Sequence, residues 1–336
     1  MNKIAAVAAA NVRDILTSAF EHDPRDQAVI VHDDDCDLAN ILSQAYRCCL
    51  PDARLLAYHA QTPEQLIPTL MALPPGSLVV LIQSSRFQLN AFRVRVELFK
   101  LGLKVIEHPH LARMEGDEVT IYIDSLAYDP AYFRDTGHAL KQRIDAAGGG
   151  TIHTGDDCLA FDSPFESAKL NVGDYRHMRN IGGQFPIGEV FTEAKELEAV
   201  SGRIRIDFFG DRQFSVNRPD QAITLVVEHG HVTGTEHTTE EFERVLKNIR
   251  ADEGKVIVRE LGLGLNRAFS ASRTVCDIGT FERMCGIHLS LGAKHHSYPK
   301  PSIRKRDAKH HVDVFVENPV FRLDDVIVFR DRAWVV

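Results

Sequence analysis

The stretch Gly182–Ala194 reads GGQFPIGEVFTEA and places three glycines and a proline ahead of the carboxylate of Glu189. Val190, Phe191 and Thr192 follow it, and such residues favour a β-strand. Glycine and proline shape the backbone without adding large side chains. The stretch is therefore either a turn that ends at a surface acid or a rigid approach that fixes a carboxylate for binding.

The whole chain has 336 residues, of which 44% are hydrophobic and 26% are charged, and its formal net charge is -8. This composition is typical of a globular protein of about two domains. The acidic balance argues against nucleic acid as the main partner, because phosphate binding depends on Lys and Arg. The basic segment KPSIRKRDAKHH at 300–311 is an exception, and it is either a solvated loop or a region that attracts an anionic substrate group.

The apolar runs and the cysteines bear on localisation. The run SLVVLIQSS at Ser77–Ser85 is among the longest, yet it is far shorter than the roughly 20 residues that cross a bilayer. The N-terminal MNKIAAVAAANVRDIL soon becomes charged and amphipathic, which predicts a first helix and not a signal peptide. The six cysteines form no C-x-x-C pair, and Cys48 and Cys49 are adjacent, which favours reduced thiols. We expect a cytoplasmic protein without membrane contact.

Residues 1–147 alternate short apolar runs with helical periodicity. Strands are predicted at 27–33, 53–59, 77–83 and 102–109, with helices between them at 36–50, 62–73 and 90–102. This alternation predicts an N-terminal α/β domain with a mainly parallel sheet. No G-x-G-x-x-G follows the first strand, so a dinucleotide site is not indicated.

The glycines at 148–150 break the preceding helix and mark the expected domain boundary. Residues 148–336 then change to a pattern of strands and hairpins. Strands are predicted within 151–162, 166–174, 202–211 and 221–234, and one helix at 238–252 starts with a Thr-Thr-Glu-Glu cap. We predict a β-rich α+β domain in this half.

Four segments of the second half carry acids or histidines beside glycines or strand residues. They hold Glu189 in the opening stretch, Glu260 after a predicted strand in VIVRELGLGLN, His288 in CGIHLSLGAKHHSY, and His311 with Asp313 in KHHVDVFVENPVF. Residues two apart in a strand project to one face, so His311 and Asp313 would form half of a metal shell. Five N and O ligands without a thiolate suit Zn, Co or Mn, and they suffice for two ions that share a carboxylate. Each segment alone also fits a hydrogen-bonded core residue or a strand end at the surface.

The order of these segments resembles the M29 family of metallo-aminopeptidases, the aminopeptidase T and aminopeptidase S group. PIGEVFT at 186–192 is similar to the family's P-x-x-E-V-F-T segment, RELGLGLN to its strand with a glutamate and glycines, GIHLSLG to its S-H-I-A-F-G segment, and HVD at 311–313 to its H-x-D strand. The likeness runs from about Gly150 to Val336. It implies a homodimer and an M29-like domain that holds two divalent ions through Glu189, Glu260, His288, His311 and Asp313.

The chain departs from this family at the position of the catalytic tyrosine, where His295 stands. His296 and Tyr298 are the other candidates for a hydrogen bond to a developing oxyanion. The 2,5-dihydroxypyridine 5,6-dioxygenases resemble the same fold with a single ferrous ion. They keep the H-x-D pair, use His where this chain has Glu260, and lack the glutamate of the E-V-F-T segment. His288, His311 and Asp313 offer the corresponding set of two histidines and one carboxylate.

The presence of both Glu189 and Glu260 favours a two-metal hydrolase over a single-iron oxygenase. We expect Glu260 to bridge two Zn, Co or Mn ions and to act in catalysis together with His295, His296 or Tyr298. The expected substrate is a small peptide or an amide-containing small molecule. The alternatives are a ring-cleaving dioxygenase with one Fe(II) and a non-catalytic binding protein on the same fold.

Overall fold

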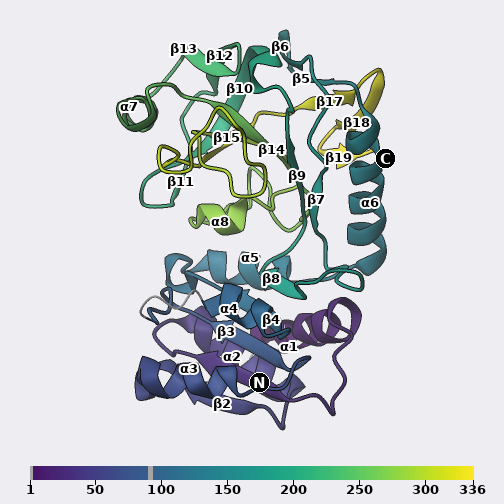
Figure 1. The fold of residues 1–336 in the computed structure, drawn as a ribbon, viewed down its shortest axis with the longest axis vertical. Coiled ribbons are helices and arrows are strands. Elements are labelled where there is room, and N and C mark those ends of the chain that lie inside the picture. The colour runs from purple at the N-terminus through teal and green to yellow at the C-terminus, as the bar shows by residue number, and fades with distance from the viewer. Residues whose placement is uncertain (1–2, 90–93) are drawn as a thin grey trace. The chain divides into compact units, whose positions relative to one another are not determined.

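The structure is a computed structural model that describes residues 3–89 and 94–336. Contacts divide the chain into two compact units. Figure 1 shows the ribbon coloured by residue number from the N-terminus to the C-terminus. Unit 1 comprises Met1–Arg134, Asn171–Ile187 and Ala271–Thr280, and unit 2 comprises Asp135–Leu170, Gly188–Ser270 and Phe281–Val336. These units are interleaved along the chain. The sequence predicts two domains that fold separately, with one boundary between residues 147 and 148, and this division stays a prediction.

Unit 1 is built on a five-stranded sheet of order β2-β1-β3-β4-β8, in which every pair is parallel. Its strands are β1 (Ala28–His32), β2 (Arg54–Ala57), β3 (Leu78–Ile82), β4 (Lys104–His108) and β8 (Gly182–Gln184). Its helices are α1 (Lys3–Asp14), α2 (Asp37–Cys49), α3 (Pro63–Met71), α4 (Val94–Lys100) and α5 (Asp117–Ser125), with shorter helical turns at Ile15–Ala19, Tyr58–Ala60 and Leu111–Arg113. The predicted α/β arrangement with a parallel sheet is confirmed. Residues 90–93 of the helix predicted at 90–102 lie outside the described residues.

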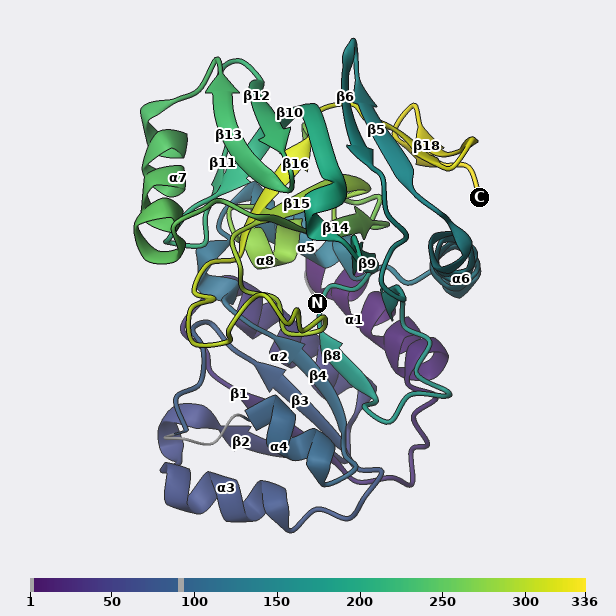
Figure 2. The ribbon, with the colours of Figure 1, turned by 45° about the horizontal axis from the view of Figure 1, so that its top comes forward.

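Helices pack on both faces of this sheet (Figure 2). On one face, Val29 and Val79 pack in a core with Leu66 of α3 and Leu98 of α4. Helices α1 and α2 lie on the other face. Strand β3 is buried along its whole length, and strands covered on both sides read as continuous apolar runs in sequence.

Strand β8 comes from the stretch GGQFPIGEVFTEA and was not expected as a strand. Residues 182–184 pair in parallel with 105–107 of β4. Gly182 has a φ of 104°, and a Cβ added there would lie 2.0 Å from the carbonyl oxygen of Val105. Only glycine tolerates this approach. The first half of the stretch therefore serves sheet pairing in unit 1, and Glu189 follows in the first strand of the next segment of unit 2.

Unit 2 is dominated by a large, curled, antiparallel sheet of 14 strands. Its main path runs in the order β19-β18-β17-β5-β6-β10-β16-β15-β14-β9-β7, with β11, β12 and β13 off this path. The strands are β5 (Gly150–Thr154), β6 (Asp157–Phe161), β7 (Lys169–Asn171), β9 (Glu189–Glu193), β10 (Val200–Gly210), β11 (Val216–Asn217), β12 (Ile223–Glu228), β13 (His231–Glu236), β14 (Val258–Gly264), β15 (Gly286–Leu291), β16 (Val312–Val316), β17 (Val320–Leu323), β18 (Val326–Arg330) and β19 (Ala333–Trp334). The predicted β-rich character of this half is confirmed.

The remaining helices are α6 (Pro130–Ala146), α7 (Glu240–Glu253) and α8 (Ile278–Phe281), with a helical turn at Leu197–Ala199. They differ widely in length, from 17 residues in α6 and 14 in α7 to 4 in α8. The side chain of Thr239 accepts a hydrogen bond from the N–H of Phe242, so α7 begins at the predicted cap. No helix within residues 3–89 and 94–336 combines the length and the apolar character that a membrane span needs.

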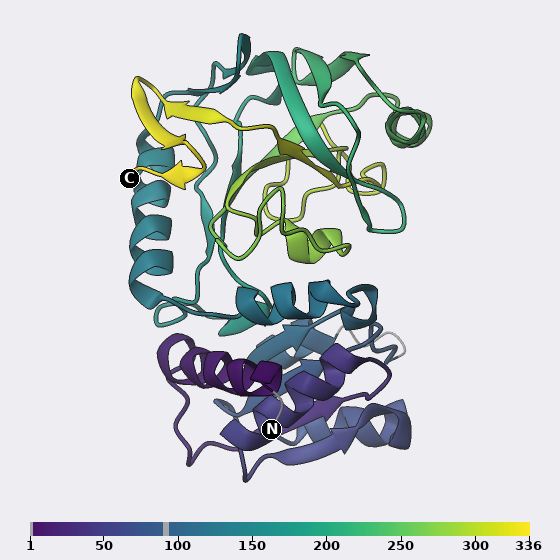
Figure 3. The ribbon, with the colours of Figure 1, turned by 180° about the vertical axis from the view of Figure 1, so that it is seen from behind.

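The core of unit 2 is aromatic. Phe281 and Phe315 lie with their ring centroids 4.9 Å apart, and Phe208 is 5.4 Å from Phe281. Helix α7 joins this unit through Phe242, whose ring lies 4.9 Å from that of Phe209. Figure 3 shows the yellow C-terminal strands beside the teal β5–β6 hairpin, where β17 pairs with β5. The neighbouring strands β14 and β15 are buried along their whole length.

Candidate metal centre

Four neighbouring strands of unit 2 bring the predicted ligands together. Strands β16, β15, β14 and β9 are adjacent and antiparallel (Figure 2). Glu189 opens β9, Glu260 lies within β14, His288 lies within β15, Asp313 lies within β16, and His311 immediately precedes β16. The expectation that Glu260 follows a strand is wrong, because β14 continues to Gly264. The side chain is held by paired strands on both sides.

The strand register explains why these side chains meet. Glu189 pairs with Gly264 across β9 and β14, and His288 pairs with Gly262 across β14 and β15. Asp313 pairs with Ser290 across β15 and β16. Because alternate residues of a strand share a face, these positions project to the same side of the sheet. Two of the facing positions are glycines, so the imidazole and carboxylates have room.

The distances divide the ligands into two groups that share one residue. In the first group, Nε2 of His288 lies 3.5 Å from Oε1 of Glu189 and 3.7 Å from Oε1 of Glu260. In the second, Nε2 of His311 lies 3.2 Å from Oδ1 of Asp313 and 4.0 Å from Oε1 of Glu260. Within each group the candidate ligand atoms lie within 4.8 Å of one another. Glu260 belongs to both groups.

The polar atoms of this centre fit divalent cations. His288 and Asp313 are 1% and 5% exposed, and their Nε2 and Oδ1 atoms have no hydrogen-bond partner. Buried polar atoms without a partner are rare unless an ion or a water satisfies them. Nδ1 of His311 lies 3.0 Å from the carbonyl oxygen of Lys294 and can only donate to it, so in the neutral ring Nε2 is the nitrogen with a lone pair for a metal. Neutral imidazole and carboxylate oxygen are ligands that Zn, Co and Mn accept.

The charge of the centre also favours a bound cation. Burial lowers the pKa of His288, but the negative charges of the nearby carboxylates of Glu189 and Glu260 outweigh it and raise this pKa to about 10. Burial likewise opposes the charge on His311, and Asp313 and Glu260 raise its pKa to about 10. Burial raises the pKa of Glu260, yet the neighbouring histidines hold it below its usual range. The cluster therefore has an excess of negative charge that protons or metal ions can balance.

The three candidates for the missing tyrosine occupy different places. Nε2 of His295 lies 2.7 Å from Oε2 of Glu260, but the angle between the two groups does not suit a hydrogen bond. Nδ1 of His295 accepts the N–H of Ser297, so Nε2 carries the proton. His296 is exposed. The hydroxyl of Tyr298 lies 2.8 and 3.1 Å from the carbonyl oxygens of Ser167 and Phe191, so the backbone engages its proton.

Sequence reasoning missed two charged residues beside the first ligand group. Arg283 is 5% exposed, and its Nη1 lies 2.9 Å from Oε2 of Glu189. Glu282 contacts the same guanidinium, and burial together with Glu189 and Asp313 raises its pKa to about 8 against the lowering effect of Arg283. The segment FERMCG contains no glycine pattern or ligand spacing that marks these residues in the sequence.

A second set of buried interactions that the sequence did not indicate involves Arg259, the residue before Glu260. Arg259 precedes Glu260 in β14 and is paired with Glu193, with both side chains at most 2% exposed. Its Nη2 donates to the carbonyl oxygen of Tyr298 at 2.7 Å, and its Nη1 donates to that of Ala293. Lys300 is the first residue of the basic segment 300–311, which we expected to be a solvated loop or a region that attracts an anion. Its side chain is only 8% exposed, and its Nζ lies 3.2 Å from Oε1 of Glu193. Arg259 thus ties both ends of the segment that carries His295.

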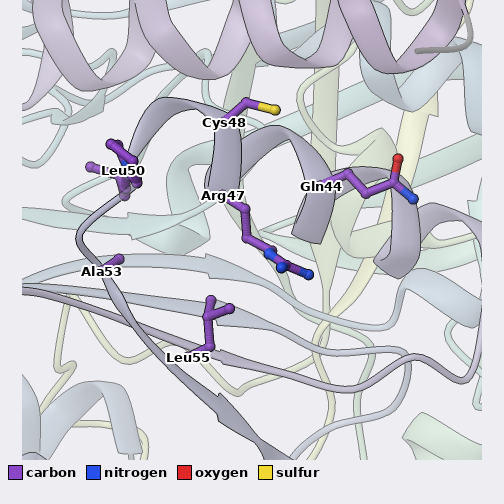
Figure 4. A pocket seen from close by; sticks show the side chains of 7 residues that line it. Gln44, Arg47, Cys48, Leu50, Ala53 and Leu55 are labelled. Carbon is purple, nitrogen blue, oxygen red and sulfur yellow. The ribbon is translucent and has the colours of Figure 1, made fainter.

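The described residues of unit 1 include one further group of possible ligands and a surface pocket. Asp33, Asp35 and His59 lie close together, but Asp33 accepts hydrogen bonds from Ser84, and Asp35 pairs with a half-exposed His59. The pocket has a volume of about 600 Å³ (Figure 4). Its lining residues are Gln44, Arg47, Cys48, Leu50, Pro51, Ala53 and Leu55. This lining has no acid or histidine, so the pocket offers no carboxylate or imidazole ligand for a metal.

Two enzymes are among the solved structures that are similar to the whole chain. 2,5-Dihydroxypyridine dioxygenase from Pseudomonas putida KT2440 matches with a TM-score of 0.65 and 15% identity, over 98% of this chain and 97% of that chain. Wild-type AmpT from Thermus thermophilus, an M29 aminopeptidase, matches with a TM-score of 0.56 and 14% identity, over 98% and 99%. The chain has an M29-like fold. No family model and no curated protein sequence matches it, so the likeness establishes the fold alone.

Proposed function

We propose that this protein is a metal-dependent hydrolase that cleaves a peptide or amide bond with a metal-activated water. The observation that carries the proposal is the pair of ligand groups joined through Glu260. Two groups that share a carboxylate suit two divalent ions, such as Zn, Co or Mn. In this proposal Glu260 is the bridge, and Glu189, His288, His311 and Asp313 are terminal ligands.

Two ions bound there would lower the pKa of a water and polarise the substrate carbonyl. The chain's own residues supply the rest of the proposed chemistry. Nε2 of His295 carries a proton and lies beside Glu260, so it is the best-placed donor to a developing oxyanion or a leaving amine. The engaged hydroxyl of Tyr298 and the exposed His296 are less suited to this role.

The proposed substrate is a small peptide or an amide-containing small molecule. A cytoplasmic homodimer without nucleic-acid or membrane partners is part of the same proposal. The dimer rests on the resemblance to the M29 family, whereas the cysteine spacing, the acidic charge and the short apolar runs support the rest. Sedimentation or light scattering tests the assembly, since a monomer near the chain mass of 37.6 kDa contradicts the dimer.

A mononuclear Fe(II) dioxygenase is the second candidate function. The dioxygenase has the higher TM-score, 0.65 against 0.56 for AmpT. Two histidines and one carboxylate, from His288, His311 and Asp313, would hold the iron. Against this set, the described residues group His288 with Glu189 and Glu260, whereas His311 and Asp313 form the other group. The division favours the two-metal hydrolase.

Metal stoichiometry distinguishes these functions. Elemental analysis is made on the protein as purified and after anaerobic loading with Zn, Mn, Co or ferrous iron. The hydrolase predicts about two ions per chain and a loss of metal in Glu189→Ala. One iron per chain that is unaffected by Glu189→Ala, with oxygen uptake, supports the dioxygenase. No bound metal under any condition contradicts both enzymes and leaves a binding protein on the same fold.

A further inference from the structure

Arg283 divides the two oxygens of Glu189 between different partners. Nη1 of Arg283 lies 2.9 Å from Oε2, whereas Oε1 faces Nε2 of His288 at 3.5 Å. The guanidinium therefore orients the carboxylate so that Oε1 is the oxygen turned toward the ligand group. Glu189 offers this group a single oxygen in this arrangement.

The charge of Arg283 is permanent and buried. A guanidinium stays protonated in proteins, so it cannot relieve repulsion by losing a proton. Arg283 is 5% exposed, and charges at such sites are weakly screened by solvent. Its direct ion-pair partners are Glu189 and Glu282, whereas His311 and Asp313 pair with each other. The cationic side chain is thus part of the Glu189 side of the centre.

We propose that the two metal positions are unequal because Arg283 is a resident countercharge at one of them. The position formed by Glu260, His311 and Asp313 binds its ion first and more tightly. The position formed by Glu189, Glu260 and His288 binds second, because a divalent ion there meets a fixed positive charge and one oxygen of Glu189. This inference rests on the proposed two-metal function and adds the order in which its ions bind.

Titration of the metal-free protein with Mn²⁺ tests the order. Free Mn²⁺ is followed by its electron paramagnetic resonance signal, so the readout does not depend on activity. The wild-type protein is expected to bind in two steps whose Kd values differ by about ten-fold or more. Glu189→Ala is expected to remove the weaker step, and Asp313→Asn the tighter one. Even if a variant fails to fold, the wild-type titration alone shows whether the two steps are unequal.

Substitution of Arg283 tests the cause. Arg283→Met removes the charge while keeping much of the side-chain volume, and it is expected to tighten the second step about ten-fold with little effect on the first. Arg283→Lys is the matched control, since it retains a positive charge and should retain two unequal steps. Circular dichroism and thermal unfolding show whether each variant is folded.

The outcomes separate this inference from the proposed function. Two equal steps in the wild type, or a second step that Arg283→Met leaves unchanged or weakens, overturn the inference and leave the hydrolase intact. One ion in the wild type and two in Arg283→Met support the inference and contradict a two-metal wild-type enzyme. Unequal steps without activity on any amide support the inference alone. No Mn²⁺ binding overturns both.

Discussion

Gly262 and His288 pair directly across β14 and β15, and the imidazole occupies the space that a side chain at position 262 would fill. A Cβ added to Gly262 would lie 2.0 Å from Nε2 of His288 and 2.1 Å from its Cε1. Real side chains do not approach this closely, so the ring must move if position 262 carries any side chain. The glycine is therefore part of the candidate metal centre although it has no ligand atom.

Replacing Gly262 with alanine is expected to displace His288 and to lower metal content by about one ion per chain. The crowding should also cost about 1–3 kcal/mol of stability. Gly234→Ala in β13 is the matched control, because its Cβ would lie 3.7 Å from the nearest atom, an ordinary contact. Elemental analysis and urea unfolding measure the two effects. Full metal content in Gly262→Ala contradicts His288 as a ligand.

Because Glu260 belongs to both ligand groups, its substitution should remove more metal than the same substitution of Glu189. Glu260→Gln is expected to remove both ions, since Glu260 belongs to both ligand groups, whereas Glu189→Gln should remove one. Glu228→Gln is the control, because Glu228 is exposed at the end of β12. Each protein is dialysed against buffer with a trace concentration of the metal, and elemental analysis then gives the number of ions per chain. Equal losses in the two centre variants would exclude Glu260 as a bridge.

The pairing of Arg259 with Glu193 predicts a large loss of stability on breaking it. Arg259→Met leaves the carboxylate of Glu193 buried, with Lys300 at 3.2 Å as its remaining cationic partner. Removing one partner of a buried pair typically costs about 3–5 kcal/mol. The substitution also frees the carbonyl oxygens of Ala293 and Tyr298, so His295 should lose its position beside Glu260.

A double-mutant cycle checks this coupling by urea unfolding. The double variant Arg259→Met with Glu193→Gln is expected to be less destabilised than the sum of the single variants, because it leaves no unpaired carboxylate. Strict additivity would mean that the pair is not coupled. Glu241→Gln with Arg244→Met is the control cycle, since these residues form an exposed pair on α7.

Asp207 predicts a pH-dependent change in stability away from the metal centre. It lies at an irregularity in the β10–β16 pairing, and burial followed by the charge of Glu317 raises its pKa to about 6, against Arg218 and Arg332. A raised carboxyl pKa stabilises the fold at low pH, and this contribution is lost as the pH rises from about 4 to above 6. The protonated form is the favoured one in the folded chain.

Asp207→Asn should therefore stabilise the protein more at pH 8 than at pH 4, by up to about 3 kcal/mol from the shift between 3.8 and about 6. The free energy of unfolding of both proteins is measured across this range. Taking the difference between them cancels the titration of the metal ligands. A difference that does not change with pH contradicts the raised pKa.

Local pattern was sufficient for most strands and for the ligand segments. The apolar run at 77–83 became β3, and the cap at Thr239 became the start of α7. The spacing of His311 and Asp313 placed their side chains 3.2 Å apart. These features depend on residues close in sequence, where backbone periodicity decides which side chains share a face. The assignment of the ligands to metal ions stays a prediction.

Other features depend on contacts between distant segments. The pairing of β8 with β4, the approach of Arg283 to Glu189 and the placement of Arg259 behind the His295 segment have no local signal. In each case the residues next to it in the sequence form no motif or spacing that indicates its partner. Its partner is determined only when the sheet brings the strands together.

The sequence by itself determined the fold class, the order of the ligand segments and the residue types available to a metal. Those properties follow from periodicity and from side-chain chemistry. The distances within the two groups that share Glu260, and the approach of a buried guanidinium to Glu189, are set only in the folded chain. The physical reason is that strand register and burial set distances and charge screening, and both arise only once β9, β14, β15 and β16 are paired.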